Sequence, residues 1–183
     1  MQFMPTEHLI IRRMRPEDWS DLLRYLGDED AQRLQNHGIY TKSECQNAIS
    51  ELSKYNTSWT VCLKSNQLAI GFITLLPMEP LSSKTYKLNF NIDPDYLSNN
   101  FIYEANKRML QYAFEELAAH RIIGWSNSQD TATNKEYVKL KMRKEGIFLK
   151  AYTYRSTKTK KPIWWDVNQF AIVKEEWLRL ELE

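Results

Sequence analysis

Apolar residues recur along the chain at two periods, one typical of strands and one typical of helices. Residues 9–13 form a short, β-branched run that predicts a first strand. Pro16, Glu17 and Asp18 predict the start of a helix, because proline fits the first turn and acids stabilise the positive end of the helix dipole. Gly27 ends this helix. Its apolar positions fall at helical spacing and are Trp19, Leu22, Leu23 and Leu26.

A second helix and a group of strands follow. Thr41 and Glu44 form a capping-box pattern, which predicts a helix that continues to Leu52. After residue 58 the period changes, and β-rich runs predict three strands, two of them joined by a polar turn at residues 64–67. These runs are residues 59–63, 68–76 and 86–92.

The second half of the chain predicts a long amphipathic helix, a strand, a short helix and two long strands. Their ranges are about 100–119, 121–125, 133–142, 145–155 and 162–173. The whole order is β-α-α-β-β-β-α-β-α-β-β, which predicts an α/β fold with a mixed sheet (α+β). The sequence contains no repeat, linker or low-complexity tract, so residues 1–183 are expected to form a single domain.

Composition agrees with a soluble globular protein and disfavours several partners. The chain has 183 residues, of which 43% are hydrophobic and 26% charged. A net charge of +2 is too small to predict a nucleic-acid or membrane partner from bulk electrostatics. The longest apolar run, residues 69–78, is about half of what a bilayer span needs, and the N-terminus shows no export signal. We therefore expect a cytoplasmic protein.

Cysteine and histidine spacing predicts no metal site. Cys45 and Cys62 are far apart, and three scattered histidines form no ligand cluster. The simplest interpretation is two reduced thiols with no catalytic role.

Nine segments resemble those of one family in order and spacing. The first, Thr6-Glu7-His8-Leu9-Ile10-Ile11-Arg12, is similar to an opening T-E-R-L-x-L-R. The others are residues 69–73, 94–96, 104–105, 112–117, 120–122, 145–146, 164–167 and 175–177. Together they resemble the ribosomal-protein (Rim-type) N-terminal acetyltransferase branch of the GNAT superfamily over nearly the whole chain.

The resemblance implies a GNAT acyl-CoA N-acyltransferase fold and an acetyl-CoA-dependent N-acetyltransferase. The acceptor would be a primary amine, either a protein N-terminal α-amino group or a small amine. The amine would attack the thioester directly, without an acyl-enzyme and without a metal. Relatives in this branch often dimerise, so Trp164, Trp165 and Phe170 form either an interface or part of the core.

The family holds the pyrophosphate of acetyl-CoA with R/Q-x-x-G-x-G/A at the start of the long helix. In this chain Asn100 replaces the first glycine, at a cost of about 1 kcal/mol for positive φ, and Ile102 replaces the second small residue. Ser98 and Asn99 are expected either to donate hydrogen bonds or to cap the helix. The matching positions, all assigned to the cofactor, are Leu97, Ser98, Asn99, Asn100, Phe101 and Ile102.

A second family pattern, N-x-x-A/S-x-x-L-Y, corresponds here to Asp130, Thr133, Glu136 and Tyr137. The resemblance implies that Tyr137 protonates the leaving CoA thiolate; a tyrosine packed on the sheet is the alternative. Asp130 and Thr133 are assigned to cofactor binding, although a carboxylate beside phosphates is unfavourable.

The general base is open, because Lys87 stands where many relatives carry glutamate. Candidates are Asp93, His37 and a water relay. The resemblance further implies that main-chain groups of Asn91, Ile92 and Asp93 contact the pantetheine arm. The amine would enter beside Asn36, His37, Tyr40 and the closing hairpin.

Two further hypotheses remain. One is a GNAT-fold binding or regulatory module without acetyl transfer, and the other is a transferase for a different acyl donor. The first is suggested by departures from the family patterns, which are Lys87, Leu97, Asn100, Ile102, Asp130 and Lys141.

Overall fold

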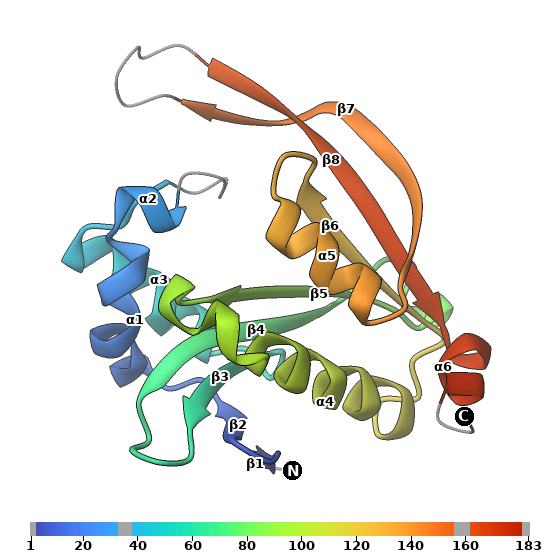
Figure 1. Ribbon diagram of the computed structural model, residues 1–183, viewed down its shortest axis with the longest axis horizontal. Coiled ribbons are helices and arrows are strands. Elements are labelled where there is room, and N and C mark those ends of the chain that lie inside the picture. Colours follow the sequence, from blue (N-terminus) through green and yellow to red (C-terminus); the bar gives the residue numbers. More distant parts are fainter. Residues whose placement is uncertain (1–2, 33–37, 156–161, 181–183) are drawn as a thin grey trace.

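The computed structural model describes residues 3–32, 38–155 and 162–180 of the chain. Within them, a mixed sheet of eight strands has the order β1-β2-β3-β4-β5-β6-β8-β7 (Figure 1). The strands are β1 (Phe3–Pro5), β2 (Leu9–Arg13), β3 (Ser58–Leu63), β4 (Ala69–Pro77), β5 (Thr85–Ile92), β6 (Arg121–Asn127), β7 (Arg143–Arg155) and β8 (Pro162–Val173). The helices are α1 (Trp19–Leu26), α2 (Glu29–Gln32), α3 (Lys42–Ser53), α4 (Phe101–Glu115), α5 (Thr131–Lys139) and α6 (Lys174–Leu180), with 3₁₀ turns η1 (Pro16–Asp18), η2 (Leu81–Ser83) and η3 (Pro94–Asn99).

The predicted α/β fold with a mixed sheet is confirmed, and the capping box forms as expected. The Thr41 hydroxyl accepts from the Glu44 N–H at 3.3 Å, and the Glu44 carboxylate accepts from the Thr41 N–H at 2.8 Å. Three short elements were not predicted: β1, α2 and α6. The short helix begins at Thr131 rather than residue 133, because Asp130 caps it.

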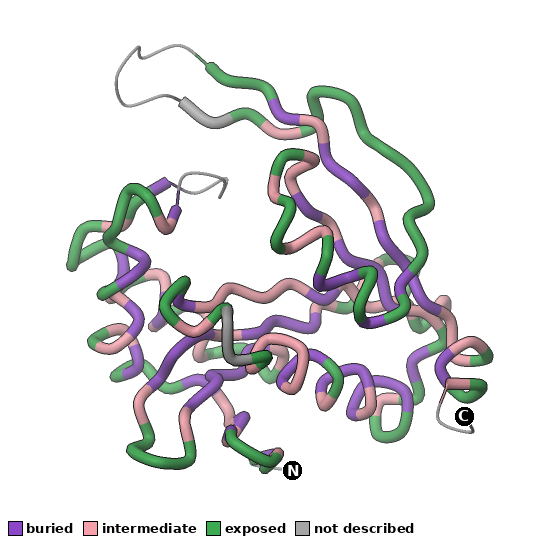
Figure 2. The backbone as a smooth tube through the Cα atoms, viewed as in Figure 1, coloured by how far each residue is buried: buried purple, intermediate pink, exposed green. Residues whose placement is uncertain are grey.

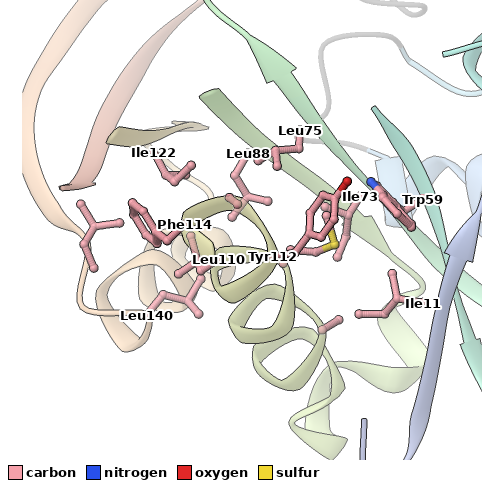
Figure 3. Close-up of a cluster of buried hydrophobic side chains, with 14 of the residues drawn as sticks. Ile11, Trp59, Ile73, Leu75, Leu88, Leu110, Tyr112, Phe114, Ile122 and Leu140 are labelled. Atoms are coloured by element: carbon pink, nitrogen blue, oxygen red, sulfur yellow. The ribbon is translucent and has the colours of Figure 1, made fainter. Parts of the chain in front are cut away.

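Two apolar clusters hold helices against opposite faces of the sheet. The larger lies between α4 and the central strands, where Leu88, Leu110, Phe114 and Ile122 pack together (Figure 3). The smaller joins α1 and α3 to β3 and β4. Buried positions follow the central strands and one side of α4, whereas β7 is exposed along most of its length (Figure 2).

Between β5 and β6 the sheet opens. These two strands are parallel, but they pair only where residues 85–87 face residues 121–123. Beyond that point β5 continues to pair with β4 as far as Ile92, and β6 continues with β8 as far as Asn127. The two halves of the sheet therefore diverge and leave a gap between neighbouring strands.

No helix in the described part of the chain is long and apolar enough to cross a membrane. Over the same residues, no group of three or more His, Cys, Asp or Glu side chains is placed to hold a metal ion.

Candidate active site

A cavity of about 310 Å³ lies at the gap between β5 and β6. Because alternate side chains of a strand point to opposite faces, Lys87 and Asn89 enter it from one face and Phe90 from the other. The cavity therefore runs through the sheet, and we call it the splay cavity. Its lining is Phe72, Lys87, Asn89, Phe90, Asn91, Trp125, Ser126, Asn127, Asp130, Thr133, Tyr137, Tyr152, Trp165 and Val167.

Tyr137 lies on α5 at the junction of the two faces. Its hydroxyl donates to the Leu88 carbonyl at 3.0 Å, and its ring stacks on Phe170 with centroids 5.2 Å apart. Burial raises the pKa of Tyr137 well above its ordinary value, so the phenol keeps its proton at neutral pH. The ring is thus packed on the sheet while the residue lines the splay cavity.

Gly124 of β6 provides the space that Tyr137 occupies, and the sequence analysis did not single it out. A Cβ atom on Gly124 would lie 2.3 Å from Cε1 of Tyr137, far inside contact distance. A glycine inside a short strand often marks a close approach, which is the signal that could have identified it.

A second hollow of about 240 Å³ lies beside η3 and the start of α4, and we call it the donor hollow. Six residues predicted to bind the cofactor meet there, and they are Asn91, Ile92, Leu97, Ile102, Asp130 and Thr133. It shares Phe90, Asn91, Asp130 and Thr133 with the splay cavity, so the two spaces adjoin.

Asn100 adopts the left-handed conformation, with φ at 62°, as expected for a residue that replaces glycine. Its side-chain oxygen accepts from the Lys139 ammonium, which brings a cation to the start of α4. Phe101 is directed elsewhere: its ring packs between His8 and Tyr96, with centroids 5.8 and 6.4 Å away. Ser98 and Asn99 belong to η3, and their side chains lie outside the described part.

Successive residues of β5 point their main-chain N–H and C=O groups alternately toward β4 and toward the gap. The Asp93 N–H donates to the Ile70 carbonyl of β4 at 2.8 Å. Asn91, two residues earlier, also points its main-chain groups toward β4, since its carbonyl lies close to Gly71. The Leu88 carbonyl instead faces the gap, where it accepts from Tyr137. The main-chain groups of Leu88, Phe90 and Ile92 therefore point toward the gap, whereas those of Asn91 and Asp93 point toward β4.

The two acids near the site have local partners. Asp93 is 2% exposed, pairs with Arg24, and accepts from the Asp95 N–H at 3.0 Å. Asp130 caps α5 by accepting from the N–H and the hydroxyl of Thr133 at 3.0 and 2.8 Å. Both carboxylates thus fix the ends of elements around the cavity.

On the opposite face, aromatic side chains from β6 and the β7–β8 hairpin line the splay cavity together with Lys87, whose ammonium lies over Trp125. They were not predicted as site residues. Of the predicted amine-side residues, Asn36 and His37 lie outside the described residues, and Tyr40 packs against the α1–α3 cluster and lines neither cavity. The aromatic closing strand divides three ways: Phe170 is core, Trp165 lines the splay cavity, and Trp164 is exposed.

Residues 8–143 match the acetyltransferase (GNAT) domain family. The chain belongs to the GNAT acetyltransferases. Among its relatives, the Bacillus subtilis N-acetyltransferase YnaD is 27% identical over 94% of this chain and 97% of that protein. A GNAT-family acetyltransferase from Bacillus anthracis superposes with a TM-score of 0.82 at 26% identity, covering 95% of this chain and 99% of that one.

Spermidine N-acetyltransferase from Vibrio cholerae, solved with CoA and spermine, shares the fold alone. Its TM-score is 0.76 at 16% identity, over 93% of this chain and 98% of that one. GNAT acetyltransferases use acetyl-CoA and act on amines.

Proposed function

We propose that this GNAT protein transfers the acetyl group of acetyl-CoA to a primary amine by direct attack, with Tyr137 as general acid. The observation that carries the proposal is the splay cavity, which passes through the sheet and has Tyr137 in its lining. A donor on the α4–α5 face and an amine on the opposite face would meet there in line, without an enzyme nucleophile.

The donor hollow supports the position of acetyl-CoA. The positive end of the α4 dipole favours an anionic pyrophosphate, and Lys139 beside Asn100 adds a cation. The pantetheine arm would pair with the free main-chain edge at Phe90 and Ile92. Ile102 is the feature that opposes this arrangement, because its branched side chain enters the donor hollow.

In the chemical step, the neutral amine nitrogen forms a bond to the thioester carbonyl carbon, and the carbon–sulfur bond breaks. Tyr137 donates its proton to the departing thiolate and regains one from water. Burial raises the pKa of the phenol, which keeps it protonated at neutral pH and also makes it a weaker acid. Among the described residues, Asp130 is the one carboxylate lining the cavity. This carboxylate already accepts a hydrogen bond from the Thr133 hydroxyl. A water relay therefore fits the removal of the amine proton better than Asp93 does.

A binding module without transfer is the second candidate, and Ile102 is the observation that favours it. Isothermal titration with acetyl-CoA, using wild type and Ile102→Gly, separates the two. Saturable binding by wild type supports the transferase. Binding by Ile102→Gly alone would show that the wild-type hollow no longer accepts its ligand, and would favour the module.

Tyr137→Phe tests the acid role by thiol release from acetyl-CoA. We expect kcat to fall by about 10²–10⁴-fold while acetyl-CoA affinity stays within about threefold. Tyr112→Phe is the matched control, since Tyr112 is also a buried helix tyrosine but lines neither cavity. A Tyr137→Phe enzyme with wild-type kcat would show that the phenol does not act as the acid.

A further inference from the structure

The amine side of the splay cavity contains a lysine on an aromatic wall. Lys87 of β5 is half-buried, and its ammonium lies 4.5 Å from the ring centroid of Trp125. Tyr152 and Trp165 complete this side, and we call the four residues the acceptor pocket. Across residues 3–32, 38–155 and 162–180, no carboxylate forms an ion pair with Lys87.

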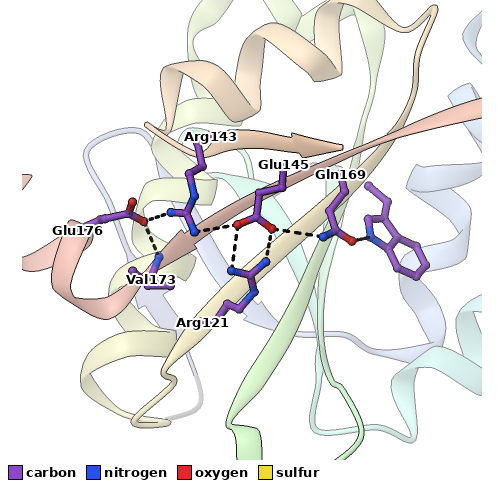
Figure 4. A network of polar contacts seen from close by, with 7 residues as sticks. Arg121, Arg143, Glu145, Gln169, Val173 and Glu176 are labelled. Carbon is purple, nitrogen blue, oxygen red and sulfur yellow. Dashed lines mark hydrogen bonds and ion pairs between the residues drawn. The ribbon is translucent and has the colours of Figure 1, made fainter. Parts of the chain in front are cut away.

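A hydrogen-bonded network fixes the wall. The Trp125 Nε1–H donates to Gln169 at 3.0 Å, and Gln169 donates to Glu145 at 3.3 Å (Figure 4). Glu145 in turn pairs with Arg121 and, at 2.7 Å, with Arg143. Because these residues come from β6, β7 and β8, the indole is oriented before any ligand arrives.

Phe148 and Tyr152 flank the indole, with ring centroids 5.8 and 6.4 Å from that of Trp125. The wall is therefore aromatic, with the Phe148 and Tyr152 rings inclined to the indole by 75° and 58°, and the Lys87 ammonium lies over the indole. Burial lowers the pKa of Lys87, since the ammonium has lost part of its water.

We propose that the acceptor pocket binds a small amine that also carries a carboxylate, with Lys87 pairing with that carboxylate over the face of Trp125. A carboxylate would supply the counter-ion that Lys87 lacks. A polycationic amine would instead be repelled. The inference rests on the proposed acetyl transfer and names its acceptor class.

The same arrangement assists the reaction. The acceptor's amine, directed toward Tyr137, would lie near the Lys87 charge, which lowers the pKa of that amine and so favours its nucleophilic neutral form. The cavity of about 310 Å³ must also contain the acetyl group, so the part of the acceptor that enters it is of amino-acid size.

The test measures thiol release from acetyl-CoA with matched amines. Each aromatic amino acid is compared with its amide and with its decarboxylated amine, and spermidine and a neutral peptide complete the panel. The amide is the stringent control, because its amine is more often neutral than that of the amino acid yet it lacks the carboxylate. We expect kcat/KM to be at least tenfold higher for the amino acids, mainly through KM.

Substitutions at Lys87 test whether this residue causes the preference for amines that carry a carboxylate. Lys87→Gln should remove the preference for the carboxylate with acetyl-CoA affinity unchanged, and Lys87→Glu should reverse the preference in favour of the decarboxylated amine. Thermal unfolding of both variants checks that the fold is retained.

Three results would overturn the inference: equal or better transfer to amines without a carboxylate, a preference that survives in Lys87→Gln, or acetyl-CoA binding without transfer to any carboxylate-bearing amine. Failure of wild type to bind acetyl-CoA is a different outcome, since it would overturn the proposed function itself.

Discussion

Glu136 is a buried acid on α5, directly before Tyr137, and it stands where the family pattern carries leucine. It is 8% exposed, faces Asn106 of α4, and one of its carboxylate oxygens has no hydrogen-bond partner among the described residues. Burial raises the pKa of Glu136 to about 7, and Lys139 and Asn106 oppose this only in part. The substitution Glu136→Gln removes the titrating group and keeps the shape.

The size of the effect on the free energy of unfolding follows from the pH at which Glu136 loses its proton in the unfolded and in the folded chain. The unfolded chain releases the Glu136 proton near pH 4.5, whereas the folded protein keeps it until about pH 7. Between these values the folded state binds the extra proton, so the free energy of unfolding falls as pH rises, by ~1.36 kcal/mol per pH unit. The full penalty above pH 7 is on the order of 3 kcal/mol, and it disappears below pH 4.5.

Urea unfolding at pH 5 and pH 8, without ligand, measures the effect. Glu136→Gln should be more stable than wild type at pH 8 by on the order of 2–3 kcal/mol, and by about 1 kcal/mol or less at pH 5. Glu115→Gln on α4 is the control, because the exposed Glu115 undergoes the same change in charge. A difference between Glu136→Gln and wild type that is equal at the two pH values would refute the reasoning.

Two other positions give sharp expectations. Gly124→Ala should cost about 1–3 kcal/mol and lower kcat, because the new methyl group displaces Tyr137; unfolding and thiol-release assays check both. Burial alone would raise the pKa of Asp18, but hydrogen bonds from Arg12 and Thr60 lower it. Asp18→Asn should therefore destabilise by about 3–5 kcal/mol at pH 7, and the difference should shrink as pH falls through the lowered pKa; a constant difference down to pH 2 would contradict this.

Strong local signals explain which elements could be predicted. The apolar stripe of α4 and the capping box at Thr41 act within one segment, so sequence alone is enough to identify them. β1 has three residues, including Pro5, and forms because it pairs with β2. α6 forms where Trp177 stacks on Phe114 of α4, a contact between distant segments that has no local signature.

The site residues also divide into those that a local sequence motif identifies and those that tertiary packing brings together. Tyr137 and the predicted residues that line the donor hollow lie in contiguous motifs, so a sequence pattern was enough to nominate them. The acceptor pocket depends on the hairpin passing over the sheet, with register shifts in β7 that bring Tyr152 beside Trp125. Such shifts follow from tertiary packing and are not visible in the spacing of residues.

The positions at which the sequence departs from the patterns that it resembles are not structurally equivalent. Asn100 adopts the positive φ that glycine would have supplied, and Asp130 caps α5 as an asparagine would. Both residues stand at the starts of the helices beside the donor hollow, Asn100 before α4 and Asp130 before α5. Ile102 differs, because it lines the donor hollow with a branched side chain. The balance between transferase and binding module therefore depends on this one side chain, and six substitutions do not count as six independent losses.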